Sequence, residues 1–160
     1  MEQDFAGYDF GAAVLPGVQW ADYNLQGISC RGANLRGANL RRVDARGAVF
    51  DGADLTGADL TAALLQGASL RQARLPQAVL RQAILVSAHL ESAVLQEADF
   101  TGANCEWSWL AGVDLQQVRV NCALFLNARG LTEASRSMLE AHGAFTGTRA
   151  MILGRELYET

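Results

Sequence analysis

The sequence is poor in the residues on which many common functions depend. Its 160 residues contain no lysine, so all thirteen basic residues are arginine, and they include only two histidines and three cysteines. Charged residues make up 19% of the chain and the net charge is −4, a balance that indicates neither a disordered tail nor a nucleic-acid partner. Half of the residues are hydrophobic, which is enough for one domain with a sizeable core.

Long apolar segments are also lacking. The first five residues are acidic and do not resemble a secretory signal, and no stretch approaches the roughly 20 apolar residues of a transmembrane helix. Cys30, Cys105 and Cys122 are odd in number and irregularly spaced, which argues against a disulfide framework or a zinc site. We therefore expect a reducing, cytoplasmic setting, with no membrane partner, no metal and no cofactor.

What the sequence does contain is a repeat of five residues. Residues 32–36 and 37–41 both read Gly-Ala-Asn-Leu-Arg, and residues 52–56 and 57–61 both read Gly-Ala-Asp-Leu-Thr. Large apolar residues, mostly leucine, fall on multiples of five from Phe5 to Phe125; we call these positions centres. A small residue, usually alanine, lies two positions before most centres, and the position directly before a centre is here called the outward slot.

A period of five fits no straight element. In an α-helix a step of five rotates by about 500°, which would scatter the centres around the axis. In a strand an odd step would place alternate centres on opposite faces. All centres can point inward only if the chain turns a corner once per repeat. Glycine two residues after many centres, as at Gly27 and Gly57, suits a type II turn, whose third residue needs a positive φ.

These residues resemble the pentapeptide-repeat family, whose pattern is A(D/N)LXX, over roughly residues 3–129. The resemblance implies an all-β solenoid, a right-handed quadrilateral β-helix with four repeats per coil, so that residues twenty apart stack. It also implies a bacterial protein of regulation or interaction rather than an enzyme, as in many cyanobacterial members. We expect an irregular N-terminal coil over 1–30, regular repeats over 31–130, a C-terminal capping helix over 131–143 and a tail over 144–160.

Catalytic chemistry finds little support in the sequence. In a four-sided coil His89 would stack between Ser69 and Trp109, with Arg71 and Glu91 on the same wall. A Ser–His–Glu group suggests a hydrolase, but flat solenoid walls offer no pocket that excludes water. We therefore interpret His89 and Trp109 as secondary surface candidates and predict no catalytic, cofactor or metal residue. The same applies to the aspartates in outward slots, which we interpret as wall-stabilising groups.

Two functions remain open. The first is a non-enzymatic scaffold or regulatory module that presents its rigid walls to an unknown protein partner. The alternative is DNA mimicry, because the family includes quinolone-resistance proteins that resemble B-form DNA and bind type II topoisomerases. Mimicry needs a strongly acidic rod. The repeats here are close to neutral, and Arg31, Arg36, Arg41 and Arg46 would surround one coil, which disfavours mimicry.

One wall is the candidate interaction surface. Its N-terminal outward slots are polar (Asp4, Asn24, Asp44), whereas its C-terminal half is predicted to carry apolar residues, interrupted by Asn104: Leu64, Ile84 and Leu124 in outward slots, Val86 and Leu126 in the next outward position, and Trp107 at the corner. A cluster of exposed apolar residues needs an explanation. The protein's own tail, through Met151, Ile152 and Leu153, could cover the cluster, a homodimer or a partner could use it, or it could simply be exposed.

Overall fold

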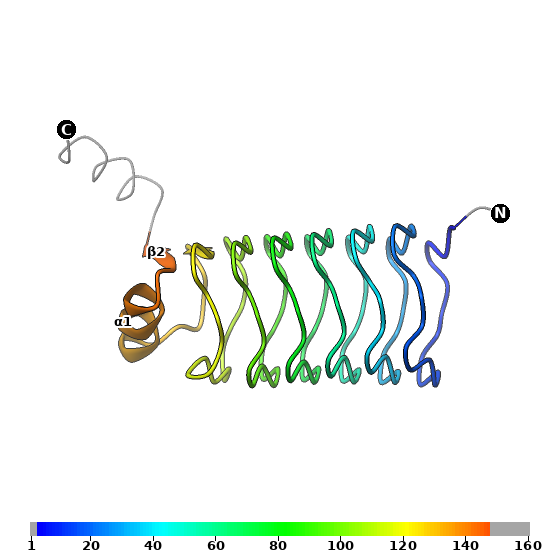
Figure 1. Ribbon diagram of the computed structural model, residues 1–160, viewed down its shortest axis with the longest axis horizontal. Helices are drawn as coiled ribbons and strands as arrows, with labels where there is room; N and C mark the ends of the chain where they lie inside the picture. Colours follow the sequence, from blue (N-terminus) through cyan, green and yellow to red (C-terminus); the bar gives the residue numbers. More distant parts are fainter. Residues whose placement is uncertain (1–2, 148–160) are drawn as a thin grey trace.

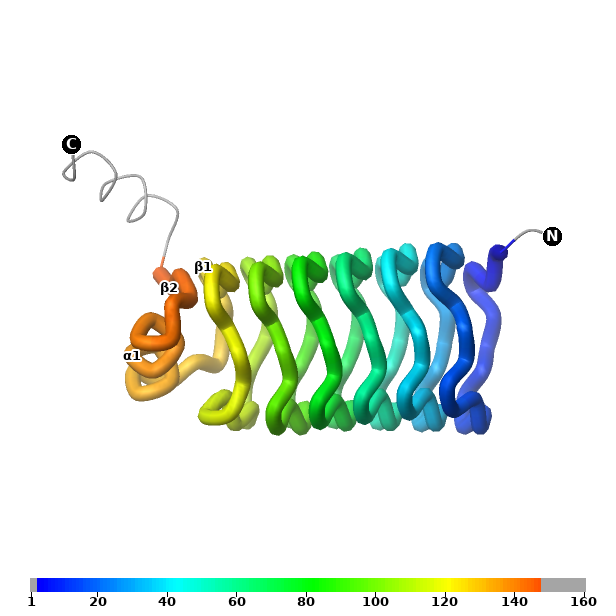
Figure 2. Tube along the Cα trace, viewed as in Figure 1, coloured from blue at the N-terminus to red at the C-terminus, as the bar shows by residue number. Residues whose placement is uncertain are grey.

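The computed structural model describes residues 3–147, and these form a straight rod of stacked coils (Figure 1). The first coil lies at one end of the rod, and the one helix of the described residues lies at the other. In each coil the chain runs through short extended pieces joined by tight turns, and each coil lies directly beside the next (Figure 2). The predicted repeat of five therefore corresponds to one extended piece and one corner.

Residues twenty apart are paired in parallel along four walls. The paired outward slots define wall A (Asp4, Asn24, Asp44, Leu64, Ile84, Asn104, Leu124), wall B (Asp9, Ser29, Val49, Ser69, His89, Trp109, Arg129), wall C (Val14, Asn34, Asp54, Arg74, Val94) and wall D (Gln19, Asn39, Asp59, Val79, Asp99, Arg119). Backbone hydrogen bonds join successive coils, as from the Leu75 N–H to the Val94 carbonyl at 2.8 Å. Pairing along all four walls confirms a four-sided tube.

The core is a column of large side chains enclosed by a column of small ones. Phe50, Leu75 and Leu80 are fully buried at centres, as the repeat predicts, and the alanines two positions before them are buried as well. Cys30 and Cys105 also occupy buried centres, and burial raises the pKa of the Cys30 thiol to about 12, so this thiol stays protonated near neutral pH. Because every centre points inward, only the outward slots and corners remain for function.

The corners are type II turns. At the corner after Leu55, Gly57 has φ of 66° and the Ala58 N–H donates to the Leu55 carbonyl at 2.9 Å. Many corners manage without glycine: Gln77 has φ of 59° in an otherwise identical turn, in which Pro76 precedes it. The positive φ is therefore imposed by the coil and not by the residue that occupies the corner.

The first coil is more regular than its sequence suggests. We expected an irregular backbone over residues 1–30, but pairing begins at Asp4 with Asn24 and keeps the spacing of twenty. The bulky residues in the small column are accommodated at the open end of the tube, where Tyr8 is exposed and Val18 and Tyr23 are only partly buried.

Three named elements end the described chain: strand β1 (Leu124–Leu126), helix α1 (Glu133–Ala141) and strand β2 (Phe145–Gly147). Thr132 caps α1 by accepting the Ser135 N–H at 3.1 Å, and Leu139 is the buried residue of the helix. Strand β2 pairs in parallel with β1, Leu124 opposite Phe145. The expectation of a tail from residue 144 did not include this strand, which adds one further rung to wall A.

Candidate interaction surfaces

The apolar residues of wall A form a stack towards the C-terminal end of the rod. Leu64 pairs with Ile84, Asn104 interrupts, and Leu124 follows. All three apolar side chains are half-buried, and β2 extends the column with Phe145, which is 44% exposed. Sequence reasoning missed Phe145, because the repeat that would have revealed its register stops before α1.

The neighbouring position on wall A is less apolar than expected. Val86 is half-buried, but Leu126 is only 3% exposed, so its prediction as a surface residue is wrong. The register places Leu126 between Glu106 and Gly147 of β2, and the strand that adds Gly147 was not foreseen. Glu106 is itself buried, and its N–H donates to the Asn104 side chain at 3.0 Å. The apolar surface therefore lies mainly in the outward slots, and Val86 is the one predicted residue of this second column that stays accessible.

Trp107 lies at the corner between walls A and B. It holds the positive-φ position of its turn, with φ of 61°, and its side chain is 48% exposed. Two residues later Trp109 begins the aromatic part of wall B. Trp107 thus lies between the apolar slots of wall A and the aromatic residues of wall B, and we call the combined surface the corner surface (Leu64, Ile84, Leu124, Phe145, Trp107, Trp109).

Stacked flat groups line wall B beside this corner. The His89 ring lies parallel to Trp109, with 5.7 Å between ring centroids, and the Arg129 guanidinium lies 4.4 Å from the Trp109 centroid. His89 Nδ1 lies 2.7 Å from an Arg71 nitrogen and 3.1 Å from Glu91 Oε1. This nitrogen accepts a hydrogen bond from Arg71 when it is unprotonated and donates one to Glu91 when it carries a proton. It therefore forms a hydrogen bond with only one of these two neighbours at a time.

The contacts of Ser69 and His89 differ from those of the nucleophile and base in a hydrolase active site. Ser69 Oγ donates to Asp51 and accepts from Arg71 at 3.2 Å, so the hydroxyl is directed away from His89. A nucleophile needs a base within hydrogen-bond reach, and His89 instead contacts Arg71 and Glu91. Within residues 3–147 no group of three or more potential ligands is arranged to hold a metal ion. The stacked cluster is therefore described best as a rigid surface.

The predicted arginine belt is an array of ion pairs. Arg31 bonds to Asp51 at 3.1 Å, Arg41 to Asp59 at 2.9 Å and Arg46 to Asp44 at 2.6 Å. Asp44 and Asp59 also accept a backbone N–H from two residues later, as Asp59 does from Thr61 at 2.9 Å, whereas Asp51 accepts the Arg71 N–H of the next coil at 3.1 Å. Burial raises the pKa of Asp59, but the hydrogen bonds from Thr61 and Arg41 outweigh it and hold that pKa below its usual value. The outward aspartates thus stabilise the wall, as the sequence indicated.

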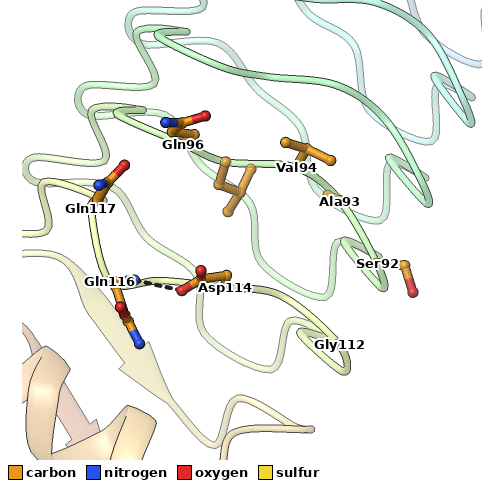
Figure 3. Close-up of a pocket in the computed structure, with 9 residues that line it drawn as sticks. Ser92, Ala93, Val94, Gln96, Gly112, Asp114, Gln116 and Gln117 are labelled. Atoms are coloured by element: carbon orange, nitrogen blue, oxygen red, sulfur yellow. Dashed lines mark hydrogen bonds between the residues drawn. The ribbon is translucent and has the colours of Figure 1, made fainter.

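Wall C contains a notch that the sequence reasoning did not foresee (Figure 3). Val94 and Asp114 should pair, but among residues 3–147 neither the Leu95 N–H nor the Asp114 N–H has a hydrogen-bond acceptor. A cavity of about 460 Å³ opens there between residues 92–96 and 112–117. A signal was present in the small column, where Val113 and Val118 replace alanine in successive repeats.

The family model and the solved structures that match this chain point to the same family. The family model of pentapeptide repeats matches this chain in eight copies, over residues 24–61, 63–102 and 85–117. Among solved structures, the pentapeptide-repeat protein Rfr23 from the cyanobacterium Cyanothece is 26% identical, with a TM-score of 0.52 over 74% of this chain and 91% of that one. No curated protein matches.

Two further solved structures are similar at lower sequence identity. HetL, a pentapeptide-repeat protein involved in heterocyst differentiation regulation in the cyanobacterium Nostoc, is 24% identical, with a TM-score of 0.37 over 79% of this chain and 62% of that one. QnrB1, a plasmid-mediated fluoroquinolone resistance protein, is 18% identical, with a TM-score of 0.40 over 98% of this chain and 84% of that one. With coils of four five-residue repeats and a matching sequence pattern over more than half its length, the chain belongs to the pentapeptide-repeat family of right-handed quadrilateral β-helices.

Proposed function

We propose that this chain is a non-enzymatic binding protein that holds a protein partner on the corner surface. The observation that carries the proposal is the gathering of apolar and aromatic residues at one corner of the rod. Trp107 and Phe145 are among the few large hydrophobic side chains that the described residues leave exposed. Aromatic residues, tryptophan above all, contribute most at protein interfaces.

Rigidity supports this assignment. The rungs beneath the corner surface are bonded to both neighbouring coils, as shown by the Asn104 N–H to the Ala83 carbonyl and the Leu124 N–H to the Ala103 carbonyl, both at 2.9 Å. A partner that binds such a wall orders little new backbone, so the entropy lost on binding is small. Helix α1 and strand β2 serve, in this proposal, as the cap that closes the end of the rod beside the binding surface.

DNA mimicry fits the surface charges less well. Acidic groups that a mimic would present as phosphates are already paired with arginine, including Asp51, Asp54 and Asp59. Paired charges give a weak external field, particularly at physiological salt. The protein's own tail is a further candidate for covering wall A, but Met151, Ile152 and Leu153 lie outside the described residues.

The test compares capture of partners by three forms of the chain. Wild type, the double variant Ile84→Glu with Trp107→Glu, and the control Val94→Glu are immobilised and exposed to native lysate, and bound proteins are identified by mass spectrometry. Val94 is an exposed apolar slot on wall C, so the control introduces a glutamate on a different wall. We expect a partner that wild type and control retain and the double variant loses, with similar melting temperatures. Identical bound sets in all three forms would refute the corner surface as the binding site.

A further inference from the structure

The two ends of the rod differ in how their strand edges are satisfied. At the C-terminal end, the Cys122 N–H donates to the Gly143 carbonyl and the Asn127 N–H to the Gly147 carbonyl, both at 2.8 Å. The segment after α1 thereby pairs with the last coil. At the N-terminal end, the Asp9, Val14 and Gln19 N–H groups have no acceptor among residues 3–147. In the next coil the equivalent N–H groups, for example that of Asn34, all donate to the preceding coil.

The N-terminal edge is also apolar. The rings of Phe5, Phe10 and Trp20 contact one another, with centroids 5.4 to 5.6 Å apart, and Phe5 and Phe10 are only partly buried. Beside them Tyr8 is 59% exposed and Val14 is 74% exposed. An open strand edge next to exposed aromatic and aliphatic side chains is a surface that favours association.

From this edge we infer that the first coil is a dimerisation surface on which a second copy of the chain is seated, N-terminal end against N-terminal end. Asp9, Val14 and Gln19 each present both an N–H and a carbonyl to the open side, because neither group is bonded within residues 3–147. That is the pattern of a residue that exchanges two hydrogen bonds with an opposite residue in an antiparallel pair.

The symmetry of a dimer explains why a second copy of the chain fits the open N-terminal edge. A two-fold axis perpendicular to the rod reverses the strand direction on every wall, so the edge strands of two copies meet antiparallel on all four sides at once. A two-fold rotation also keeps the hand of both coils. A single extended peptide would satisfy only one wall. The C-terminal end of another copy is unsuitable, because the segment after α1, which includes β2, already pairs with its last coil.

The surface charge gives the dimer a characteristic salt dependence. Asp4 and Asp9 lie on the first coil, and within residues 3–147 neither has an ion-pair partner, whereas Asp22 is paired with Arg42 at 2.7 Å. Two copies would bring these carboxylates together, and salt screens repulsion between exposed charges. Dimerisation at this end should therefore strengthen as salt rises, which is the opposite of an association held by ion pairs.

The experiment measures molar mass by light scattering and sedimentation over roughly 1 to 100 µM protein, where weak specific dimers form and dissociate. The variant is Val14→Pro, which removes an edge N–H that is unbonded in the single chain and places the ring on the edge, where proline is tolerated. The control is Val14→Thr, which keeps the N–H and the shape. We expect wild type and Val14→Thr to reach the mass of two chains and Val14→Pro to remain a monomer with an unchanged circular dichroism spectrum.

Two further results decide the location of the interface. Ile84→Glu with Trp107→Glu should leave the dimer intact, because those residues lie on the corner surface; a dimer lost in that variant alone would move self-association there and overturn the inference. A wild type that stays monomeric over the whole range, or a dimer unaffected by Val14→Pro, would also overturn it. Neither of these last two results bears on partner binding at the corner surface.

Discussion

The N-terminal and C-terminal halves of the rod share a core but differ on the surface. Between residues 24 and 61 the outward slots are mostly Asn and Asp, and arginine–aspartate pairs link one coil to the next. Between residues 72 and 97 every corner uses a residue other than glycine, and Val79, Ile84 and Val94 occupy slots. The centres are nevertheless buried in both halves. The inward columns fix the fold, so the outward columns are free to differ.

The same comparison applies to the defects of the ladder. The N-terminal half is bonded rung to rung on all four walls, whereas wall C opens at residues 112–117. Within residues 3–147, segment 113–117 makes only local hydrogen bonds, such as the Gln116 N–H to Asp114 at 3.0 Å. A second cavity of about 310 Å³ separates it from Met138 of α1. The last coil is thus held on three walls, and its stability depends on β1, β2 and α1.

The largest expected effect follows from removing that support. Deletion of residues 131–160 would uncover Phe125, which is now buried, and would free the hydrogen-bond donors of the last coil. Exposed strand edges pair with other chains, so we expect aggregation or end-to-end association. Size-exclusion chromatography and thermal melting would measure this. A truncated protein that stays monodisperse and equally stable would show that the last coil needs no cap.

The next largest effect is expected from truncating buried centres, which should cost more unfolding free energy in the N-terminal half than in the C-terminal half. Leu60→Ala removes a fully buried centre between bonded rungs and should cost about 3 to 5 kcal/mol of unfolding free energy. Leu115→Ala lies in the detached segment, beside the cavity near Met138, and should cost closer to 2 kcal/mol because water already reaches its surroundings. Denaturant unfolding measures both values. Equal losses would mean that the notch closes in solution.

Acid should weaken the N-terminal half through its aspartates. Hydrogen bonds and arginine neighbours outweigh burial and hold the pKa values of Asp54 and Asp59 below the ordinary value of about 3.9. The stability that these groups contribute is complete above that value and is lost as pH falls through their lower pKa values in the folded state. The melting temperature should therefore drop below about pH 4. In Asp54→Asn with Asp59→Asn the drop should be smaller; an unchanged drop would assign acid sensitivity to other groups.

The smallest effects concern the corners. The space around the Gly57 α-carbon is open, so Gly57→Ala introduces no clash and only places alanine at positive φ, which costs on the order of 1 kcal/mol. Gln77→Gly changes a corner of the C-terminal half in the opposite direction and should alter unfolding free energy by less than about 1 kcal/mol, since lost strain is offset by greater freedom of the unfolded chain. Paired denaturant curves would test this. A larger loss for Gln77→Gly would show that its side chain supports the wall.

Much of this structure could be predicted from the sequence because the five-residue repeat determines which residues point inward. The period of five placed Phe50 and Leu75 in the core, and the four repeats per coil that the family resemblance implies placed His89 beside Trp109. The features that escaped prediction depend on contacts between segments without the repeat. Phe145 joins wall A only because α1 returns the chain to the last coil, and Leu126 becomes buried for the same reason. The notch coincides with two successive bulky residues in the small column, Val113 and Val118, and the period does not say whether a coil tolerates them.

The stacking of each residue on the one twenty positions later has a consequence for how such a chain can change in length. Excision or duplication of twenty residues within the regular coils, for example 36–55, would shorten or lengthen the rod by one rung of ~4.8 Å and leave every later residue on its own wall. Excision of five residues would preserve the core pattern equally well, yet it would turn everything downstream by a quarter circle. The corner surface would then face a different direction relative to the N-terminal end. Gain or loss of whole coils therefore changes only the length of the rod, whereas gain or loss of single repeats also changes the direction in which the downstream surface faces.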